Sequence, residues 1–345
     1  MVSAEGRKKL VLDFLSEKTE GKKYEVIEDI PGVGPATAEK LKQMGFQTIE
    51  SLATATIKEL EAAGIGDKVA VKVIEHARGG VSFSFVTAAE LIKLRETVRQ
   101  LTTGSKAVDE LLASGLETQT ITEFYGQYGA GKSIMCHQLA VNVQLPEEKG
   151  GLDGGALYID TEQTFRPEWI IRMAKMLGLD PFKAAERIIY AEAYNSDHQI
   201  LLLEKADRII KDKGIRLIII DSLTAHFRSE YLGRGMLAER QQTLNSHMHR
   251  LCRLARVFNA VAVVTNQVMA RPDTFIPIVE PVGGNVVAHT SHTRVFLRRA
   301  SSGPVRIARL VSSTHLPEGE RIFKITENGI EDAEEKDRTP ARGST

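Results

Sequence analysis

The stretch that decides the fold is Glu123–Val141, EFYGQYGAGKSIMCHQLAV. It places a glycine-rich segment between ITEFYG, an apolar run typical of a strand, and SIMCHQLAV, a run typical of a helix. Gly126, Gly131, Lys132 and Ser133 satisfy the pattern G-x-x-x-x-G-K-[ST], in which backbone N–H groups surround phosphate groups. A strand before the loop and a helix after it are the context that this pattern requires. The stretch therefore predicts a site for a nucleoside triphosphate.

The residues expected to contact the triphosphate form one continuous segment. Lys132 is expected to neutralise the β- and γ-phosphates, and the Ser133 hydroxyl to bind Mg²⁺. A dinucleotide-binding loop needs G-x-G-x-x-G, and the spacing of Gly126, Gly129 and Gly131 does not fit it. The predicted ATP-binding residues of this loop are Gly126, Gln127, Tyr128, Gly129, Ala130, Gly131, Lys132 and Ser133.

Two acidic stretches are candidates for the rest of the site. Asp221 ends the apolar run RLIIIDS, where a carboxylate can hold Mg²⁺ through water; an aspartate that caps a strand-to-helix turn is the alternative. The run ALYIDTEQTF ends with Asp160 and Glu162, either of which can instead serve as an acid at a helix N-terminus. We take Glu162 as the candidate base that deprotonates an attacking water, because it lies past the end of the strand, where the γ-phosphate would be exposed.

Composition excludes several classes of protein. The chain has 345 residues, enough for about two domains, with 42% hydrophobic residues and a formal net charge of zero. Any nucleic-acid-binding role therefore has to come from local patches of charge. Cys136 and Cys252 are too few for a disulfide framework and lack zinc-ligand spacing, which favours a reduced intracellular compartment. No apolar run reaches the ~18 residues of a membrane span, so no membrane partner is expected.

A small all-α domain is expected at residues 25–79. The segment IPGVGPATAEKLKQMGF contains a glycine turn before a helix, and GIG forms a second, less persuasive turn. Gly32 and Gly34 allow a tight hairpin whose N–H groups point outward, and Lys40 lies on the following helix, which suits a DNA phosphate. The spacing resembles a paired helix-hairpin-helix module, which binds the DNA backbone without reading sequence. Two loops of a plain helical bundle are the alternative.

The rest of the chain is predicted to comprise a linker, a larger α/β domain and a tail. Residues 80–99 form the linker, in which VSFSF has the alternation of one short strand. From residue 100 to residue 331, near-continuous apolar strands alternate with helices, which predicts a mainly parallel sheet covered on both faces. The runs TRVFLRR, VRIARLVS and RIFKITENGIED are expected to add short antiparallel strands. Residues 1–24 are expected to be flexible, and residues 332–345 disordered.

Several long motifs together resemble one family. They are TGSKAVDELLASGLETQTITEFYGQYGAGKS, YIDTEQTFRPEWI, AYNSDHQ, DSLTAHFRSEYLGRGMLAERQQ and TNQVMARPD. These segments resemble the archaeal RadA recombinases of the RecA superfamily, and the likeness extends from about Ile27 to Asp332. The resemblance implies a RecA-like P-loop ATPase core, preceded by the helix-hairpin-helix domain. It also implies a DNA-dependent ATPase that uses ATP and Mg²⁺, forms helical filaments on single-stranded DNA and catalyses homologous pairing and strand exchange in recombination and double-strand break repair.

The resemblance also assigns roles to single residues. Glu162 is then the catalytic carboxylate, and Gln267, at the end of VVTNQ, senses the γ-phosphate. In FVTAAE, Phe85 and Ala88 resemble the polymerisation motif that enters apolar pockets of the adjacent subunit; a Phe85 that folds back on its own domain is the alternative. Trp169 replaces the arginine that packs on adenine in relatives. We therefore expect its indole to stack on the base, with burial in the helix packing as the alternative.

Two loops are expected to line a channel for DNA. The first, RSEYLGRGMLAER, sets arginines around glycines, a composition that suits the backbone of a single strand; without the resemblance, solvated loop arginines are the better interpretation. The second extends from about Val268 to Gly284 and carries side chains that can contact the backbone or stack on bases. The predicted DNA-binding residues of the two loops are Arg228, Arg234, Arg240, Arg271 and Phe275.

Two other functions share part of these features. A ring-forming helicase has the same ATPase core, but the hairpin module does not indicate processive unwinding. A paralogue that only loads a recombinase would bind ATP and DNA without strand exchange. The expected partners are single- and double-stranded DNA and further copies of this chain in filaments or rings, with recombination mediator proteins as further candidates. The expected location is the cytoplasm, in association with the nucleoid.

Overall fold

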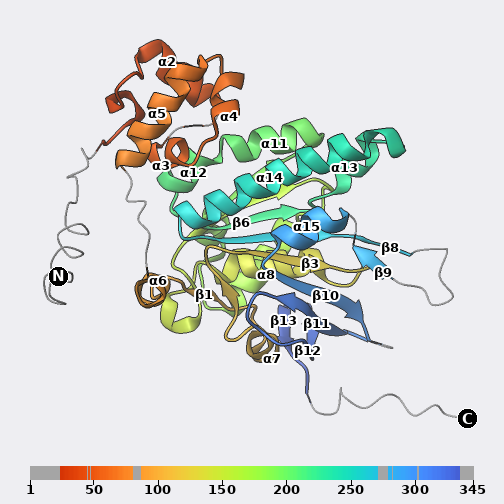
Figure 1. The fold of residues 1–345 in the computed structure, drawn as a ribbon. Helices are drawn as coiled ribbons and strands as arrows, with labels where there is room; N and C mark the ends of the chain where they lie inside the picture. Colours follow the sequence, from red (N-terminus) through yellow and green to blue (C-terminus); the bar gives the residue numbers. More distant parts are fainter. Residues whose placement is uncertain are drawn as a thin grey trace, which may run out of the picture. The chain divides into compact units, whose positions relative to one another are not determined.

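The computed structural model describes residues 24–44, 46, 48–80, 87–270, 279–281, 283–300 and 303–334 (Figure 1). The chain divides into two compact units, Met1–Val86 and Thr87–Thr345. The polymerisation-motif residue Phe85 and the VSFSF segment lie outside the described residues, as do Arg271 and Phe275 of the second predicted DNA loop.

The first unit is a bundle of short helices around one apolar core. Its elements are the 3-10 helix η1 (Ile27–Asp29) and the α-helices α2 (Pro35–Gln43), α3 (Ile49–Ala53), α4 (Ile57–Ala62) and α5 (Asp67–Gly80). The side chains of Thr48 and Thr56 accept hydrogen bonds from the third residue of α3 and α4, and both helices begin with such a capping box. The largest core residues include Ile27, Leu41, Phe46, Leu52, Leu60 and Val73. Short capped helices around one core are what the sequence of this unit predicts.

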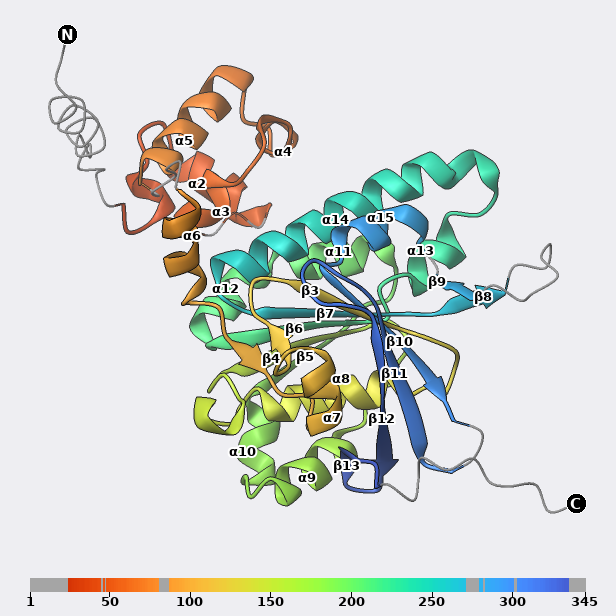
Figure 2. The ribbon, with the colours of Figure 1, turned by 60° about the horizontal axis from the view of Figure 1, so that its bottom comes forward.

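The second unit is a large sheet with helices on both faces (Figures 1 and 2). Its helices are α6 (Ala88–Arg95), α7 (Lys106–Leu111), α8 (Lys132–Asn142), η2 (Glu147–Lys149), α9 (Pro167–Met176), α10 (Pro181–Glu186), α11 (Ser196–Glu204), α12 (Ala206–Asp212), α13 (Ala225–Glu230), η3 (Arg234–Met236), α14 (Leu237–Val257) and α15 (Gly284–Thr290). Its strands are β1 (Gln100–Leu101), β2 (Leu116–Glu117), β3 (Ile121–Tyr125), β4 (Gly155–Asp160), β5 (Ile188–Glu192), β6 (Ile215–Asp221), β7 (Val261–Asn266), β8 (Val268–Ala270), β9 (Val279–Pro281), β10 (Thr293–Arg299), β11 (Val305–Ser313), β12 (Gly319–Thr326) and β13 (Gly329–Asp332).

Within the described residues the large sheet has nine strands, in the order β13-β12-β11-β10-β3-β7-β6-β4-β5. The neighbours from β10 to β5 all run parallel, and β11, β12 and β13 continue the sheet antiparallel. This order confirms the predicted α/β fold with a mainly parallel sheet.

For the first of the three late strands, the antiparallel prediction holds on one side only. Strand β10, TRVFLRR, runs parallel to β3, with Val295 opposite Phe124, and antiparallel only to β11. The reason is that helix α15 precedes it and returns the chain across the sheet, as a parallel connection requires. The segment RIFKITENGIED forms two strands, β12 and β13, because the chain turns at residues 327–328 and Gly329, the first residue of β13, takes a positive φ of 121°.

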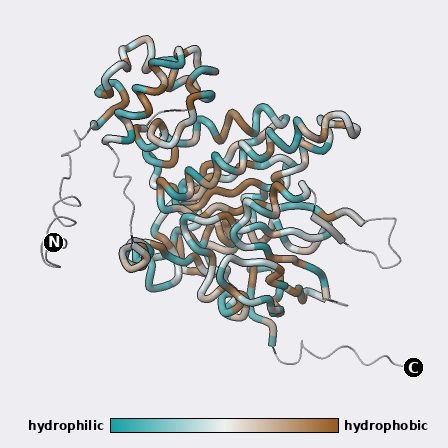
Figure 3. Tube along the Cα trace, in the orientation of Figure 1, coloured by the Kyte–Doolittle hydropathy of each residue, from teal (hydrophilic) through white to brown (hydrophobic). Residues whose placement is uncertain are grey.

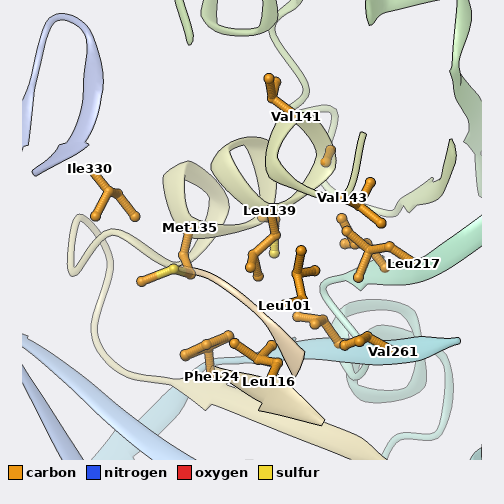
Figure 4. Packing of buried hydrophobic residues seen from close by; sticks show 14 of the residues in the cluster. Leu101, Leu116, Phe124, Met135, Leu139, Val141, Val143, Leu217, Val261 and Ile330 are labelled. Carbon is orange, nitrogen blue, oxygen red and sulfur yellow. The ribbon is translucent and has the colours of Figure 1, made fainter. Parts of the chain in front are cut away.

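Alternate residues of the strands build the two layers of the core. Phe124, Tyr158 and Ile219 belong to the cluster that packs on α8 and α9, whereas the adjacent Ile159 and Ile220 pack toward α14. Figure 4 shows the first cluster from close by, with Met135 and Leu139 of α8 facing the strand residues Phe124 and Val261. Hydrophobic segments are concentrated along the central strands in Figure 3. Strands buried on both faces explain the near-continuous apolar runs in the sequence.

The sheet also fixes where the functional candidates lie. Strands β3, β4, β6 and β7 are mutually parallel neighbours and end at Tyr125, Asp160, Asp221 and Asn266. Parallel strands end at the same edge of a sheet, and the carboxyl edge is where ligands bind in open α/β folds. The residues that follow these four strands therefore share one edge.

The structure also describes both ends of the predicted core domain. Residues Ala88–Arg95, predicted as linker, form helix α6. At the other end, the carboxylate of Asp332 in β13 accepts from the Ser105 hydroxyl at 2.6 Å and the Ala107 N–H at 3.0 Å. Asp332 is thus tied to the start of α7.

Candidate functional site

The phosphate loop joins β3 to α8 and needs its glycines for steric reasons. Gly131 is the N-cap of α8 with a φ of 105°, and a Cβ there would lie 2.5 Å from Cδ1 of Ile325. A Cβ on Gly126 would lie 2.1 Å from the carbonyl oxygen of Leu297. A side chain at Gly126 would collide with the backbone of β10, and one at Gly131 would push the Ile325 side chain aside and force a positive φ on a residue with a Cβ. The loop therefore has the compact backbone that lets N–H groups approach phosphate oxygens.

Lys132 begins α8 and folds back over the loop. Its ammonium group donates to the carbonyl oxygens of Gly126 at 2.9 Å and Gln127 at 3.1 Å. Burial lowers the pKa of Lys132, and the negative charges of Asp221 and Glu162 counteract part of this effect. A partly desolvated cation surrounded by carbonyl groups and two carboxylates suits a dense anion such as a triphosphate.

A cleft of about 390 Å³ opens over this loop. Its walls come from the phosphate loop, from the ends of β4, β6 and β7, and from the antiparallel strands β11 and β12. The residues that line it are Tyr128, Gly129, Gly131, Lys132, Ser133, Ile134, Glu162, Thr164, Arg166, Asp221, Gln267, Arg306 and Ile325. The structure thus brings together most of the predicted ATP and Mg²⁺ residues in one cleft.

Asp221 is almost completely buried at the floor of the cleft. Its carboxylate accepts from the Tyr158 hydroxyl at 2.7 Å, from the Thr265 hydroxyl, and from the Thr164 hydroxyl at 3.4 Å. Burial and the nearby Asp221 charge raise the pKa of Tyr158, so its phenol stays protonated and donates. These partners are side chains and not the backbone N–H groups of a turn, which argues against the capping alternative for Asp221.

Asp160 and Glu162 play different parts. Asp160 is fully buried, and its carboxylate accepts from the backbone N–H groups of Glu162 at 3.0 Å and Phe165 at 2.9 Å. Glu162 is exposed to the cleft, where its carboxylate accepts from the Gln267 amide and from the Ser222 hydroxyl. Asp160 thus fixes the loop that presents Glu162. Neither acid starts a helix, because the N-cap of α9 is Arg166.

His137 ties the first turn of α8 to the same loop. Its Nε2 accepts from the Arg166 N–H at 3.0 Å, which leaves Nδ1 to carry the proton and donate to the Ser133 carbonyl oxygen at 2.5 Å. The ring stacks on Phe165 with centroids 5.0 Å apart. Burial lowers the pKa of His137, so the neutral form persists. The sequence offered no local signal for this contact, because the two segments meet only in the folded sheet.

Trp169 does not line the cleft. It lies in α9, packs against the apolar cluster on that side of the sheet, and has the Arg172 guanidinium 5.6 Å from its ring centroid. This packing agrees with the alternative given for Trp169 from the sequence. Adenine stacking stays a prediction.

The predicted first DNA loop is largely helical. Arg228 lies in α13, Arg234 in η3 and Arg240 in α14, so only a short turn separates the helices. Arg228 is exposed and donates from Nη1 to Oε1 of Gln267 at 3.4 Å. Arg240 is half-buried, and its Nε has no hydrogen-bond partner in the described part of the chain. Helix α14 begins within this segment because its sequence, LAERQQTLNSHMHRLCRLARV, follows an amphipathic pattern from Leu237 onward.

The remaining candidates lie in the first unit and in α6. Gly32 has a φ of 93°, and Gly34 is the N-cap of α2 with Pro35 at its first position, as the sequence predicts. The Lys40 ammonium is exposed and lies 3.8 Å from where a Cβ on Gly64 would be, so this lysine lies beside the second turn. Ala88 is the exposed first residue of α6.

The structure adds five cleft residues that the sequence did not predict. They are Ile134, which directly follows Ser133, and Thr164, Arg166, Arg306 and Ile325. Thr164 and Arg166 follow Glu162 closely, and the motif around it was the available signal. Arg306 and Ile325 come from strands far along the chain, for which the sequence gave none.

No group of three or more His, Cys, Asp or Glu side chains suited to a metal ion occurs among the described residues. None of the helices in that part of the chain combines the length and apolar character needed to cross a membrane.

Comparisons with known proteins agree with this geometry. Residues 94–333 match the Rad51 family model, and residues 24–78 match the model of the SAM-like helix-hairpin-helix tandem. The DNA repair and recombination protein RadA of Aeropyrum pernix is 50% identical over 310 residues, which cover 89% of this chain and 97% of the relative. The protein of the same name from Ignicoccus hospitalis is 50% identical over 323 residues, covering 92% and 98%. With the family model matching more than half of the chain, and with relatives this similar along almost their whole length, the chain belongs to the Rad51 family and, within it, to the archaeal RadA recombinases.

Proposed function

We propose that this chain is a DNA-dependent ATPase that assembles on single-stranded DNA and catalyses homologous pairing and strand exchange. The observation that carries the proposal is the cleft in which Lys132, Asp221 and Glu162 meet over a phosphate loop. The 50% identity to two RadA proteins supports the recombination function. The SAM-like helix-hairpin-helix match supports DNA binding by the first unit.

The residues of the cleft fit ATP with Mg²⁺. Mg²⁺ keeps several waters and takes few protein ligands when phosphates supply the others. Ser133 and Asp221 would hold it, and when bound it would neutralise charge on the phosphates. Gly126 and Gly131 let the loop pack closer to Leu297 and Ile325 than a Cβ would allow.

The proposed hydrolysis divides the work among four side chains. Lys132 would exchange its two carbonyl partners for the β- and γ-phosphates. Glu162 would accept the proton of the attacking water, while Gln267 and Ser222 hold its carboxylate in place. ATP binding would create the DNA-competent state, and hydrolysis would release it.

DNA contacts and assembly also belong to the proposal. The proposed DNA-binding residues are Gly32, Gly34, Lys40, Arg228, Arg234, Arg240, Arg271 and Phe275. Phe85 and Ala88 would join one copy of the chain to the next. Support for assembly comes from Leu91 and Ile92 of α6, which are 50% and 68% exposed. Strand β5 adds to it, because this strand ends the sheet and, among the described residues, pairs only with β4. Such a filament would lie on chromosomal DNA.

The domain limits given from the sequence are proposed with it. The matched ranges 24–78 and 94–333 and the division after Val86 support a helical domain near 25–79 and an ATPase core near 100–331. Mediator proteins and the stacking of Trp169 on adenine remain parts of the proposal without support from a contact.

A joint-molecule assay tests the function. Homologous single- and double-stranded DNA are incubated with the chain, ATP and Mg²⁺, and joint molecules are counted beside an unwinding control. We expect joint molecules from the wild type and from Lys149→Ala, an exposed lysine outside the cleft, and none from Lys132→Ala. Unwinding without joint molecules would indicate a helicase motor instead, and ATP-dependent DNA binding with neither activity would indicate a loader.

A further inference from the structure

Two arginines lie beside the phosphate loop on the side away from Glu162. Arg299 and Arg306 are directly opposite each other in the antiparallel pair of β10 and β11. A guanidinium nitrogen of Arg299 lies 3.8 Å from the position that a Cβ on Gly129 would take. Arg306 lines the cleft. Both arginines are therefore within reach of what the loop binds.

Among the described residues, no carboxylate forms an ion pair with either of these arginines. Neighbouring arginines of the same sheet have acidic partners: Arg298 with Glu320 at 3.5 Å, Arg309 with Glu318 at 3.6 Å, and Arg321 with Glu110 at 3.9 Å. Within the ranges that the structure describes, neither Arg299 nor Arg306 forms an ion pair. Like charges opposite each other across a strand pair are destabilising. A bound anion would balance the two positive charges of this pair.

Arg306 has hydrogen-bonding capacity left over. Its Nη1 donates to the carbonyl oxygens of Gly303 at 3.1 Å and Val305 at 3.0 Å, which holds the side chain in place. Its Nε is buried and has no partner among the described residues. Burial and the charge of Arg299 lower the pKa of Arg306, which agrees with a cation that lacks its counter-ion. Buried donors of this kind are normally satisfied by a ligand or by water.

The order of the strands decides which part of a nucleotide would reach Arg306. Glu162 and Asp221 follow β4 and β6, which lie on one side of β3, whereas β10, β11 and β12 lie on its other side. A triphosphate whose γ end meets the acids and their Mg²⁺ therefore extends its nucleoside end toward β11 and β12. Ile325 of β12 lines the cleft there and offers an apolar surface.

We propose that Arg306 binds the α-phosphate of the nucleotide held by the phosphate loop of the same subunit, with Arg299 as a second positive charge beside it. The proposal rests on the proposed binding of ATP. A guanidinium matches phosphate oxygens with two parallel N–H groups, and the bound phosphate would relieve the repulsion between the two arginines.

Nucleotide affinity of the full chain tests this assignment. Arg306→Gln removes the positive charge and the two parallel N–H donors of the guanidinium. We expect ATP and ADP to bind this variant about ten- to a hundredfold more weakly, as for loss of a charged hydrogen bond. Arg306→Lys keeps the charge without the parallel donors and should lose less affinity. The matched control is Arg309→Gln, which removes the same charge from the same strand. Arg309 lies three residues after Arg306 and therefore on the opposite face of the strand. It should bind like the wild type.

Two further measurements distinguish loss of the phosphate contact from other causes of weaker binding. Without nucleotide, Arg306→Gln should melt no lower than the wild type, because a like-charge contact is removed, so a weaker affinity cannot be due to unfolding. Inorganic tripolyphosphate, which has no nucleoside, should also bind the variant more weakly. Unchanged affinity for ATP, or a loss for ATP with none for tripolyphosphate, would overturn the α-phosphate assignment. A wild type that does not bind ATP would instead refute the proposed function.

Discussion

The side-chain amide of Gln267 donates to both carboxylate oxygens of Glu162, at 3.1 and 3.2 Å. The Ser222 hydroxyl donates to one of these oxygens at 2.5 Å. Gln267 follows β7 and Ser222 follows β6, so the ends of two neighbouring strands orient the carboxylate that follows β4. A base held by fixed donors loses little freedom when it acts, which is what preorganisation requires.

Replacing Glu162 with glutamine tests its role as the base. We expect ATP hydrolysis to fall by about 10²–10⁴-fold, the usual contribution of a general base, because an amide cannot take the proton. ATP binding should persist, since Lys132 and the glycine loop are unchanged, and DNA should remain bound in the ATP state. Phosphate release and nucleotide binding are measured together, with the exposed Glu168→Gln on α9 as the control. A variant that no longer binds ATP would show that Glu162 does something else.

Arg228 links this site to the proposed DNA surface, because it donates to Gln267 at 3.4 Å. Arg228→Gln should weaken binding of single-stranded DNA. The slope of log affinity against log salt should fall by about one if the arginine contacts a phosphate. The control is Arg208→Gln on α12, an exposed arginine paired with Asp212. The measurement is DNA affinity over a range of salt concentrations; equal slopes for the two variants would remove Arg228 from the DNA contacts.

Glu230, the last residue of α13, supports the start of α11. Its carboxylate accepts from the Ser196 N–H at 2.9 Å and from the Ser196 hydroxyl, so it satisfies donors at a helix N-terminus. Glu230→Ala should lower the free energy of unfolding by about 1 kcal/mol, as for loss of a helix cap. Glu230→Gln, which keeps an acceptor, should lose less. Denaturant unfolding measures the change, with the exposed Glu239→Ala of α14 as the control; equal stabilities of all three variants would refute the cap.

His247 predicts a loss of stability in acid. Burial lowers its pKa from 6.5 to about 4, and its Nε2 lies 3.2 Å from the Nε2 amide group of Gln199, which donates to it. The unfolded chain therefore takes up a proton below pH 6.5 that the folded chain refuses until about pH 4. Stability is retained above pH 6.5 and lost as the pH falls between these values, by up to about 3 kcal/mol.

The contribution of His247 is isolated by substitution. The free energies of unfolding of wild type, His247→Phe and His249→Gln are measured from pH 7 to pH 4. His249 is exposed on the same helix and should leave the pH dependence unchanged. The phenylalanine variant should lose less stability than the wild type over this interval. If its pH dependence equals that of the wild type, His247 is not the titrating group.

Part of this site was predictable from the sequence because its chemistry is local. The phosphate loop is eight consecutive residues, so its spacing alone indicated Lys132 and Ser133. Asp221 and Glu162 were indicated because each follows a buried apolar run, and parallel strands bring such ends together. For the same reason the sheet, its helices and the two units followed from periodicity and from the glycine turns.

Other features of the site could not be predicted from the local sequence pattern. The direction of β10 depended on α15. The role of Asp160, whose carboxylate is buried by the backbone N–H groups of Glu162 and Phe165, was visible only in the fold. Glu162 and Gln267 lie 105 positions apart and meet only because β7, β6 and β4 are neighbours. Arg306 entered the cleft because β11 pairs with β10, a pairing that no single stretch of sequence encodes.

The sequence by itself determined which residues carry charge, which residues allow the backbone to turn and which apolar segments tend to be buried. These are properties of side chains and their nearest neighbours in the chain. Only the tertiary structure decided which distant groups share one cleft: the order of strands is set by how all the apolar faces pack at once. That order places the acids on one side of the phosphate loop and Arg299 and Arg306 on the other.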